Sequence, residues 1–335
     1  MTKIFNIDSL NLNNDKLKEA GLALKNGKTV IFPTETVYGL GANGLDETAI
    51  KKIYKAKGRP SDNPLILHLS NVEDIKKYAY INEELLNKIK KITPGPITFV
   101  LIKKEIVPDI VTANRETVAI RIPAHPIARE LIKNAGVPIA APSANISGKP
   151  SLTRSKDVIE EMNNRVDYII TSDDPDFGLE STVIDLTKKN VVLLRPGPIS
   201  PEKLKDIFGK IEVPDFIYGK KEADIAIAPG MKYRHYSPEK PVILVKDFSK
   251  DFKNDIKNFK KPVFFILKEN LKFIKNDGFD YEIIDKNYFE FAVKLFALLR
   301  KYDKTHDAII IESLKDEGIG IAIMNRLRKA ASKII

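Results

Sequence analysis

The chain of 335 residues contains no cysteine, no tryptophan and only four histidines. The absence of cysteine excludes disulfide bonds, thiolate metal sites and cysteine nucleophiles. No uninterrupted apolar run approaches the ~18 residues that a membrane-spanning helix needs, and no basic-then-apolar leader opens the chain. With 43% hydrophobic and 30% charged residues, the sequence has enough apolar side chains for a folded core. We therefore expect a soluble, cytoplasmic protein.

Positive charge is in excess, but it is not concentrated in any one segment. Lysine and arginine number 55 and aspartate and glutamate 45, which gives a net charge of +10. Residues 1–240 and 241–335 each contribute half of this excess, and no block of like charges forms a tail. Proteins that bind nucleic acids usually gather their cations on one face. The charge pattern therefore favours ordinary solvated lysines over a nucleic-acid surface.

The composition changes near residue 240. Eighteen of the 20 prolines precede Pro241, whereas ten of the 16 phenylalanines follow it. A chain of this length is expected to form about two domains. Residues 210–240 mix charge, glycine and proline without a helical or strand period, which is typical of a linker. We predict a first domain at residues 1–209, a linker at 210–240 and a small second domain at 241–335.

Short apolar runs alternate with helical patterns in the second domain, and this alternation predicts a small, Rossmann-like parallel α/β sheet. The expected strands are residues 242–245, 263–267, 281–284 and 309–311. The expected helices are residues 248–259, 288–301 and 319–333. No residue of this domain has a pattern that indicates catalysis.

The first domain is richer in turns, and its pattern predicts a mixed α/β sheet with helices around it. The expected strands are residues 29–32, 65–69, 98–102, 118–122, 183–186 and 191–194. The expected helices are residues 14–25, 46–57, 83–91, 127–134 and 201–208. Ser200 is expected to cap the last of these helices, with Pro201 in its first turn.

Two short motifs resemble nucleotide-binding loops without their structural context. Residues 39–44 have the spacing G-x-G-x-x-G, but six residues separate them from the preceding strand, whereas the dinucleotide-binding loop follows its strand directly. Gly27-Lys28-Thr29 resembles the end of a phosphate loop, but the upstream Gly21 is one residue too far away and the lysine precedes a strand. We therefore reject both interpretations.

Polar loops of unusual chemistry follow several of the expected strands. Lys55, Lys57 and Arg59 place three cations within five residues, which suits a polyphosphate. Lysines in a last helical turn before a glycine also make an ordinary helix end, and this alternative explains the lysines but not Arg59. Further polar strings follow at residues 140–148, 178–183 and 194–198. Each could be a turn by itself, but so many clusters in one domain indicate a common site.

Two polar side chains fall within expected strands. Alternation places Arg121 on the opposite face from Val118, Ile120 and Ile122. A buried arginine needs an anionic partner, which is either a carboxylate of the protein or that of a substrate. His68 has a similar position, and a single histidine in a strand is more often structural than catalytic.

These strings, in this order, resemble the threonylcarbamoyl-AMP synthase family of YrdC-like proteins over about residues 12–205. Residues 229–238, followed by an α/β domain, resemble the long form of that family. The resemblance implies a YrdC-like mixed, twisted sheet with an open cavity. It also implies a nucleotidyltransferase that converts L-threonine, bicarbonate or CO₂, and ATP into threonylcarbamoyl-adenylate and pyrophosphate. A separate threonylcarbamoyl transferase then modifies an adenosine next to the anticodon, so that tRNA is only an indirect partner and no membrane is involved.

The resemblance further implies a role for particular residues. The residues that would hold threonine are Thr34, His68, Arg121, Ser143 and Ser181, with Arg121 facing the carboxylate. The residues that would hold the polyphosphate are Lys57, Arg59 and Asn63, with Lys55 nearby and with Lys57 and Arg59 as the catalytic pair. The residues that would line the nucleotide site are Thr117, Ala141, Ser151 and Arg195. His235 and Tyr236 would cover the cavity as a lid. Mg²⁺ is expected to accompany ATP, without a dedicated carboxylate cage.

Two other functions are compatible with a related fold. A double-stranded RNA-binding protein would use a basic concave surface, but the even charge distribution and the lack of aromatic stacking motifs count against it. A carbamoyl transferase of hydrogenase maturation would be expected to carry zinc-finger cysteines, and this chain has none.

Overall fold

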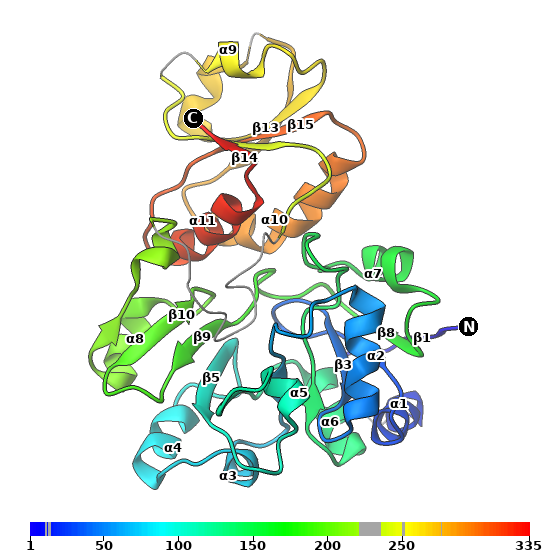
Figure 1. Cartoon of the computed structure of the whole chain (residues 1–335). Helices are drawn as coiled ribbons and strands as arrows, with labels where there is room; N and C mark the ends of the chain where they lie inside the picture. The colour runs from blue at the N-terminus through cyan, green and yellow to red at the C-terminus, as the bar shows by residue number, and fades with distance from the viewer. Residues whose placement is uncertain (11, 13–14, 221–235, 250–251, 276) are drawn as a thin grey trace.

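Two β-sheets organise the protein in the computed structural model, which describes residues 1–10, 12, 15–220, 236–249, 252–275 and 277–335 (Figure 1). Within these residues the larger sheet has 11 strands in the order β1-β8-β2-β3-β7-β4-β6-β5-β9-β10-β11, and the smaller has five in the order β14-β13-β15-β12-β16. The expected α/β class, with one mixed and one parallel sheet, is confirmed. No helix of the described segments is long and apolar enough to cross a membrane.

The larger sheet belongs to the first part of the chain. Its strands are β1 (Lys3–Asn6), β2 (Val30–Phe32), β3 (Gly39–Asn43), β4 (Ile66–His68), β5 (Ile97–Ile102), β6 (Thr117–Arg121), β7 (Ile139–Ala140), β8 (Tyr168–Thr171), β9 (Thr182–Asp185), β10 (Val191–Arg195) and β11 (Ile211–Glu212). The sheet is mixed, because β4 and β6 pair parallel whereas β5 and β6 pair antiparallel. The six expected strands are confirmed to within one residue at each end.

Helices surround this sheet and begin and end at residues that the sequence marks. They are α1 (Asp15–Lys25), α2 (Glu47–Lys57), α3 (Ile75–Tyr78), α4 (Glu83–Lys90), α5 (Asp109–Thr112), α6 (Pro126–Ala135), α7 (Ser155–Met162) and α8 (Pro201–Phe208), with short 3₁₀ turns η1 (Val72–Asp74) and η2 (Asp215–Tyr218). Asp46 caps α2 by accepting hydrogen bonds from two backbone amides, and Gly58 ends it with a φ of 60°. Ser200 caps α8 as expected.

The rejected G-x-G-x-x-G motif lies in a strand, not in a phosphate-binding turn. Its first five residues form β3, which pairs antiparallel with β2. A side chain at Gly41 would meet Ile139 Cγ2 at 2.7 Å and Phe32 Cε1 at 2.8 Å. This glycine is therefore required by close packing within the sheet, not by a bound nucleotide.

The second domain is a parallel sheet with a helical layer that faces the first domain (Figure 1). Its strands are β12 (Val242–Val245), β13 (Pro262–Leu267), β14 (Asp280–Ile284), β15 (Ala308–Glu312) and β16 (Lys333–Ile334). The remaining elements are α9 (Lys253–Ile256), the 3₁₀ helix η3 (Lys268–Phe273), α10 (Tyr288–Asp303) and α11 (Ile319–Ala330). The four expected strands are confirmed, and every strand pair that the structure describes in this sheet is parallel.

Two helix predictions in this domain are wrong in extent. Of residues 248–259, only the four residues of α9 are helical, and residues 250–251 lie outside the described residues. Phe248 and Phe252 instead pack together and against Phe264, with ring centroids 4.7 to 6.3 Å apart. The helix expected at 319–333 ends at Ala330, because the chain then adds β16 to the edge of the sheet.

Helices α10 and α11 bind the second domain to the first. Arg300 of α10 forms an ion pair with Glu161 at 2.7 Å, and both side chains are largely buried. Asn325 of α11 donates a hydrogen bond to the carbonyl of Ile217 at 2.9 Å. The backbone of Val293 lies so close to Gly178 that a side chain there would overlap it. The two sheets thus share a packed interface, while the exact domain boundaries stay a prediction.

Candidate active site

A cavity in the first domain, next to this interface, collects polar side chains from distant parts of the sequence. The space that no protein atom fills there is about 690 Å³, open solvent included. It is lined by Thr34, Val37, Tyr38, Gly39, Lys57, Arg59, Ile66, His68, Arg121, Ala141, Pro142, Ser143, Asn145, Ser147, Gly148, Lys149, Glu180, Arg195 and Tyr236. These residues come from the loop after β2 and the start of β3, from the end of α2 and the loop after it, and from strands β4 and β6. The others come from the segment after β7, the segment before β9, the end of β10 and the segment before β12.

Nine of the described residues predicted for the site lie in this lining. They are Thr34, Lys57, Arg59, His68, Arg121, Ala141, Ser143, Arg195 and Tyr236. Ser181, Asn63 and Ser151 are buried just behind the wall, where they contact lining residues. Lys55 and Thr117 lie elsewhere, and His235 is outside the described residues. Residues separated by more than 150 positions thus converge on one cavity, as the sequence analysis predicts.

Arg121 is held by a carboxylate of its own domain. One Nη atom lies 2.9 Å from Glu35 Oε1 and donates a hydrogen bond to Thr36 Oγ1 at 2.9 Å. Burial acts most strongly on Glu35 and raises the pKa of its carboxyl, but the charge of Arg121, together with hydrogen bonds from Arg121 and from backbone amides, lowers it more, so that this pKa lies below its usual value. Arg121 Nε is buried without a hydrogen-bond partner among the described residues. The protein therefore supplies one anionic partner for the guanidinium, and the N–H group of Nε still needs a hydrogen-bond acceptor.

Thr34 and His68 complete the polar wall beside Arg121. Thr34 Oγ1 donates to the carbonyl of Val37 at 2.6 Å and so closes a tight turn after β2. His68 Nδ1 lies 3.1 Å from the carbonyl of Ile66. Burial, followed by the nearby charge of Arg121, lowers the pKa of His68 to about 3. The imidazole is therefore neutral at physiological pH.

Lys57 is buried at the end of α2 and is bound to backbone carbonyls. Its Nζ donates to the carbonyl of Ser143 at 2.6 Å and to that of Asn145. Burial, together with the neighbouring charge of Arg59, holds the pKa of Lys57 well below its usual value. The side chain fixes the 143–145 segment, which itself lines the cavity.

Arg59 projects into the same cavity just beyond α2. Its Nη2 donates to the carbonyl of Pro64 at 3.0 Å and its Nε to that of Asn63 at 3.3 Å. Burial lowers its pKa to about 10, so that it still carries a full positive charge at neutral pH. Asn63 thus acts on Arg59 through its backbone, and its side chain lies outside the lining.

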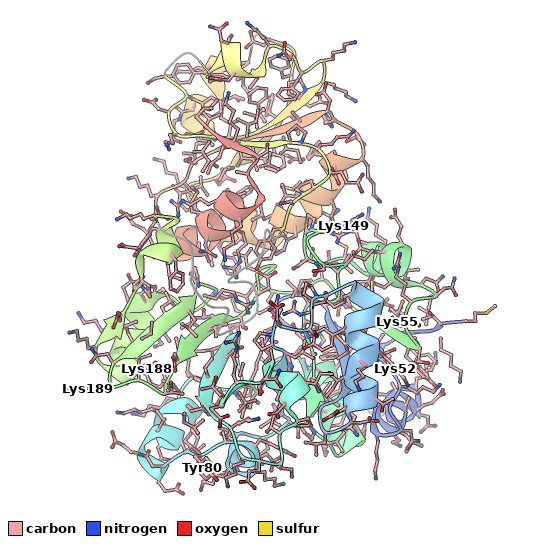
Figure 2. The ribbon with its side chains drawn as sticks, viewed as in Figure 1. Lys52, Lys55, Tyr80, Lys149, Lys188 and Lys189 are labelled. Atoms are coloured by element: carbon pink, nitrogen blue, oxygen red, sulfur yellow. The ribbon has the colours of Figure 1, made fainter. Side chains whose placement is uncertain are left out.

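Lys55, which the sequence places near the phosphates, is not among the lining residues of this cavity. Lys55 shares a different surface depression with Lys52, Thr29 and Asp167. Figure 2 shows Lys52 and Lys55 on the same side of α2. Residues two positions apart in a helix point about 200° apart, so Lys57 faces the cavity and Lys55 cannot. Of the two lysines, Lys57 is thus the one that lines the cavity.

Thr117 is also outside the lining formed by the described residues. It begins β6, opposite Ile102 of β5, four residues before Arg121. At 3.3 Å per strand residue it lies roughly 13 Å from Arg121. Its predicted place in the nucleotide site is therefore not supported.

Ser181 supports Arg195 from behind. Arg195 donates through Nε to the carbonyl of Ser181 and through Nη2 to its hydroxyl, both at 3.0 Å. The same hydroxyl lies 2.8 Å from Thr98 Oγ1. Ser181 is completely buried and positions a lining residue.

Glu180 is a lining residue that the sequence reasoning missed. It is 5% exposed, and its Oε1 accepts a hydrogen bond from the hydroxyl of Ser151. Its Oε2 lies 3.0 Å from Nε of Arg326, which belongs to α11 of the second domain. Residue 180 lies within the polar string 178–183, but no sequence signal connects position 180 with position 326. The pair becomes visible only when the two domains are packed together.

Tyr236 is the described end of the segment predicted as a lid. It is 6% exposed, lines the cavity, and stacks on Phe296 of α10 with ring centroids 5.3 Å apart. Burial raises the pKa of its hydroxyl. The cavity wall therefore includes a residue that the second domain holds in place.

Comparison with known proteins identifies relatives of the whole chain. A family model named Sua5_yciO_yrdC and described as "Telomere recombination" matches residues 22–197, and a model described as "Threonylcarbamoyl-AMP synthase, C-terminal domain" matches residues 199–332. A threonylcarbamoyl-AMP synthase of Pyrococcus abyssi is 44% identical, covering 99% of this chain and 98% of its own. That of Bacillus subtilis is 39% identical, covering 97% and 95%. The crystal structure of P. abyssi Sua5 complexed with L-threonine has a TM-score of 0.89 at 42% identity and covers 99% of both chains.

Proposed function

This chain belongs to the Sua5/YrdC family of threonylcarbamoyl-AMP synthases, and from that premise we propose how its cavity residues share the reaction. The protein is a nucleotidyltransferase that converts L-threonine, bicarbonate and ATP into threonylcarbamoyl-AMP and pyrophosphate. Its product serves a tRNA modification. Family membership does not fix the roles of single residues, and we infer these roles from the contacts in the cavity.

The chemistry requires positioning and charge stabilisation more than a covalent protein intermediate. The amine of threonine becomes a carbamate, and a carbamate oxygen then attacks the α-phosphorus in line with the departing pyrophosphate. Negative charge builds on phosphate oxygens during this step, and preorganised cations in a dry site stabilise it most effectively. Among the described lining residues the cations are Lys57, Arg59, Arg121, Lys149 and Arg195.

We assign the threonine subsite to the wall around Arg121. Glu35 and Thr36 hold the guanidinium at one Nη, and the buried Nε still needs an acceptor, which the carboxylate of threonine would provide. Thr34, Ser143 and the neutral His68 surround it. Because His68 remains uncharged, it can accept or donate a hydrogen bond without adding a charge to be balanced.

The rest of the cavity lining, which we call the nucleotide wall, is assigned to ATP. Arg59 and Lys57 bind the polyphosphate, with Asn63 orienting Arg59. Ala141, Arg195 and Tyr236 line the nucleotide part, and Ser151 and Ser181 act behind it on Glu180 and Arg195. The observation that carries the proposal is this placement of Arg59, Arg121 and Arg195 on one cavity, since an amino acid and a triphosphate must meet there.

Further partners follow from the reaction. Mg²⁺ enters with ATP, because it shields the negative charge of the phosphates. The carbon source is bicarbonate or CO₂, a separate transferase consumes the product, and tRNA is reached only through it. We place the reaction in the cytoplasm, where ATP and tRNA are available.

The decisive experiment measures pyrophosphate release from ATP with each substrate omitted in turn. We expect release only when threonine and bicarbonate are both present, and release that is independent of threonine contradicts the proposal. The alternative, double-stranded RNA binding, predicts an affinity that needs no threonine and whose logarithm falls linearly with the logarithm of salt concentration. A filter-binding titration over a range of salt concentrations tests it.

A further inference from the structure

The second domain inserts a buried arginine against the outside of the cavity wall. Arg326 of α11 is only 1% exposed, and its guanidinium points into the first domain. Its Nε donates to Glu180 Oε2 at 3.0 Å, its Nη1 to the carbonyl of Pro196, and its Nη2 to the carbonyl of Glu180 at 3.4 Å. Its Cζ also lies 5.7 Å from the centroid of the Tyr236 ring, within range of a cation–π contact.

The partners of Arg326 belong to two strand-end segments that carry the nucleotide wall. Glu180 lines the cavity directly, and the next residue, Ser181, accepts two hydrogen bonds from Arg195. Pro196 follows Arg195 in the chain. One guanidinium therefore binds both segments at the positions adjacent to the contact between Arg195 and Ser181.

Glu180 is an unexpected group in a site for a triphosphate. Among the lining residues that the structure describes, it is the one carboxylate beside five cations. ATP brings about four negative charges at neutral pH, so a carboxylate repels it and competes with it for the cations. Burial acts most strongly on Glu180 and raises the pKa of its carboxyl. The charges of Arg326 and Arg195, together with hydrogen bonds from Ser151 and from the backbone, lower it more, so that this pKa lies below its usual value. Glu180 is thus ionised and within the electrostatic range of both arginines.

We propose that Arg326 is a positioning residue for ATP binding: by pairing with Glu180 from the second domain, it prevents this carboxylate from drawing Arg195 out of the nucleotide wall. The inference rests on the proposed function, because it takes Arg195 as a contact of the nucleotide. It gives the second domain a part in the site, since α11 supplies the charge that balances Glu180. A purely structural Arg326 would instead affect the docking of the domains without favouring one substrate.

The test is a double-mutant cycle on the full-length protein, with affinity for a non-hydrolysable ATP analogue measured by calorimetry. Arg326→Met should weaken binding of the analogue about 10- to 100-fold, as expected for one partner removed from a buried charge pair. The affinity for threonine should change less than threefold. The double variant Arg326→Met/Glu180→Gln should return to within threefold of the wild type, because no carboxylate then competes for Arg195. Arg326→Lys keeps the positive charge but not the forked guanidinium, so its affinity for the analogue should lie between those of the wild type and Arg326→Met.

A matched control separates this effect from general damage to α11. Arg328, two residues away, pairs with Asp316 of its own domain at 2.5 Å. Arg328→Met should leave both affinities unchanged. The inference is overturned if the double variant binds the analogue no better than Arg326→Met does. It is also overturned if Arg326→Met lowers the affinity for threonine as much as the affinity for the analogue. Failure of the proposed function would show differently, as wild-type protein that binds the analogue but releases no pyrophosphate with threonine and bicarbonate.

Discussion

The two walls of the cavity are built on different principles. On the threonine wall, Arg121 is held by Glu35 and Thr36, which belong to the same domain and lie in the loop after β2. On the nucleotide wall, Glu180 is held by Arg326 and Tyr236 stacks on Phe296, and both partners belong to the second domain. The comparison teaches that one subsite is complete within the first domain, whereas the other depends on the packing of the two domains. We therefore expect their substrates to respond differently to mutation.

The largest expected effect is on the threonine wall. Arg121→Met should raise the KM for threonine about 100- to 1,000-fold, because it removes the proposed partner of the carboxylate and leaves Glu35 buried without its counter-ion. The KM for ATP should change far less. Steady-state pyrophosphate release at varied threonine and fixed ATP measures the difference, and circular dichroism checks that the variant is folded. The exposed Arg129 on α6 provides a control in Arg129→Met, which should behave as wild type. An equal rise in the KM for threonine and in the KM for ATP would show that the two walls do not act separately.

The end of α2, which we propose contacts the phosphates, offers a sharper contrast between two lysines. Lys57→Met removes the donor to two backbone carbonyls and should lower kcat about 10- to 100-fold, since the 143–145 segment loses its anchor. Lys55→Met, two residues away on the other face, should alter kcat less than twofold and the free energy of unfolding by less than about 0.5 kcal/mol. The same pyrophosphate assay and a urea titration measure both. An effect of Lys55→Met as large as that of Lys57→Met would contradict the assignment of the site to one face of the helix.

Arg59 should affect ATP alone. Arg59→Met removes a charge from the phosphate side while leaving Arg121 and Glu35 in place, so the KM for ATP should rise about tenfold. Threonine binding, measured by calorimetry without nucleotide, should stay within twofold of the wild type. If threonine binding falls in step with ATP use, Arg59 lies closer to the amino acid than proposed.

How much of this could be read from the sequence differs between the two walls. Arg121 and Arg59 stand out locally, one as a cation within an apolar strand and the other as a cation that helix capping does not explain. The pair of Glu180 and Arg326 spans 146 positions, and neither residue is exceptional in its own segment. Only the packing of α11 against the ends of β9 and β10 brings them together. The sequence thus predicts site residues that stand out within their own segment. It misses contacts that side chains of another domain make with the site.

The secondary structure follows the same rule. The six apolar runs of the first domain are strands to within one residue because burial and flanking turns define them locally. Strand β3 is absent from the expected strands, since two of its five residues are glycines and it is specified by its packing on Phe32 and Ile139. The expected helix at 248–259 failed because its phenylalanines pack as an aromatic cluster over the sheet, a tertiary preference that outweighs the local helical period.

A pH dependence of the folding stability is expected from the threonine wall. The pKa of His68 is about 3 in the folded protein and about 6.5 when unfolded, so below pH 6.5 the unfolded chain binds a proton that the folded protein does not. Stability is therefore greatest above pH 6.5 and is lost as the pH falls from 6.5 towards 3, by up to about 1.4 kcal/mol per pH unit. His68→Gln keeps a hydrogen-bonding side chain and should unfold with a shallower dependence on pH over this window. Urea titrations of both proteins at intervals from pH 7 to pH 4 measure the difference, with His125→Gln as a control for a less buried histidine. Parallel curves for wild type and His68→Gln would mean that His68 is charged in the folded protein, and the neutral role assigned to it beside Arg121 would then fail.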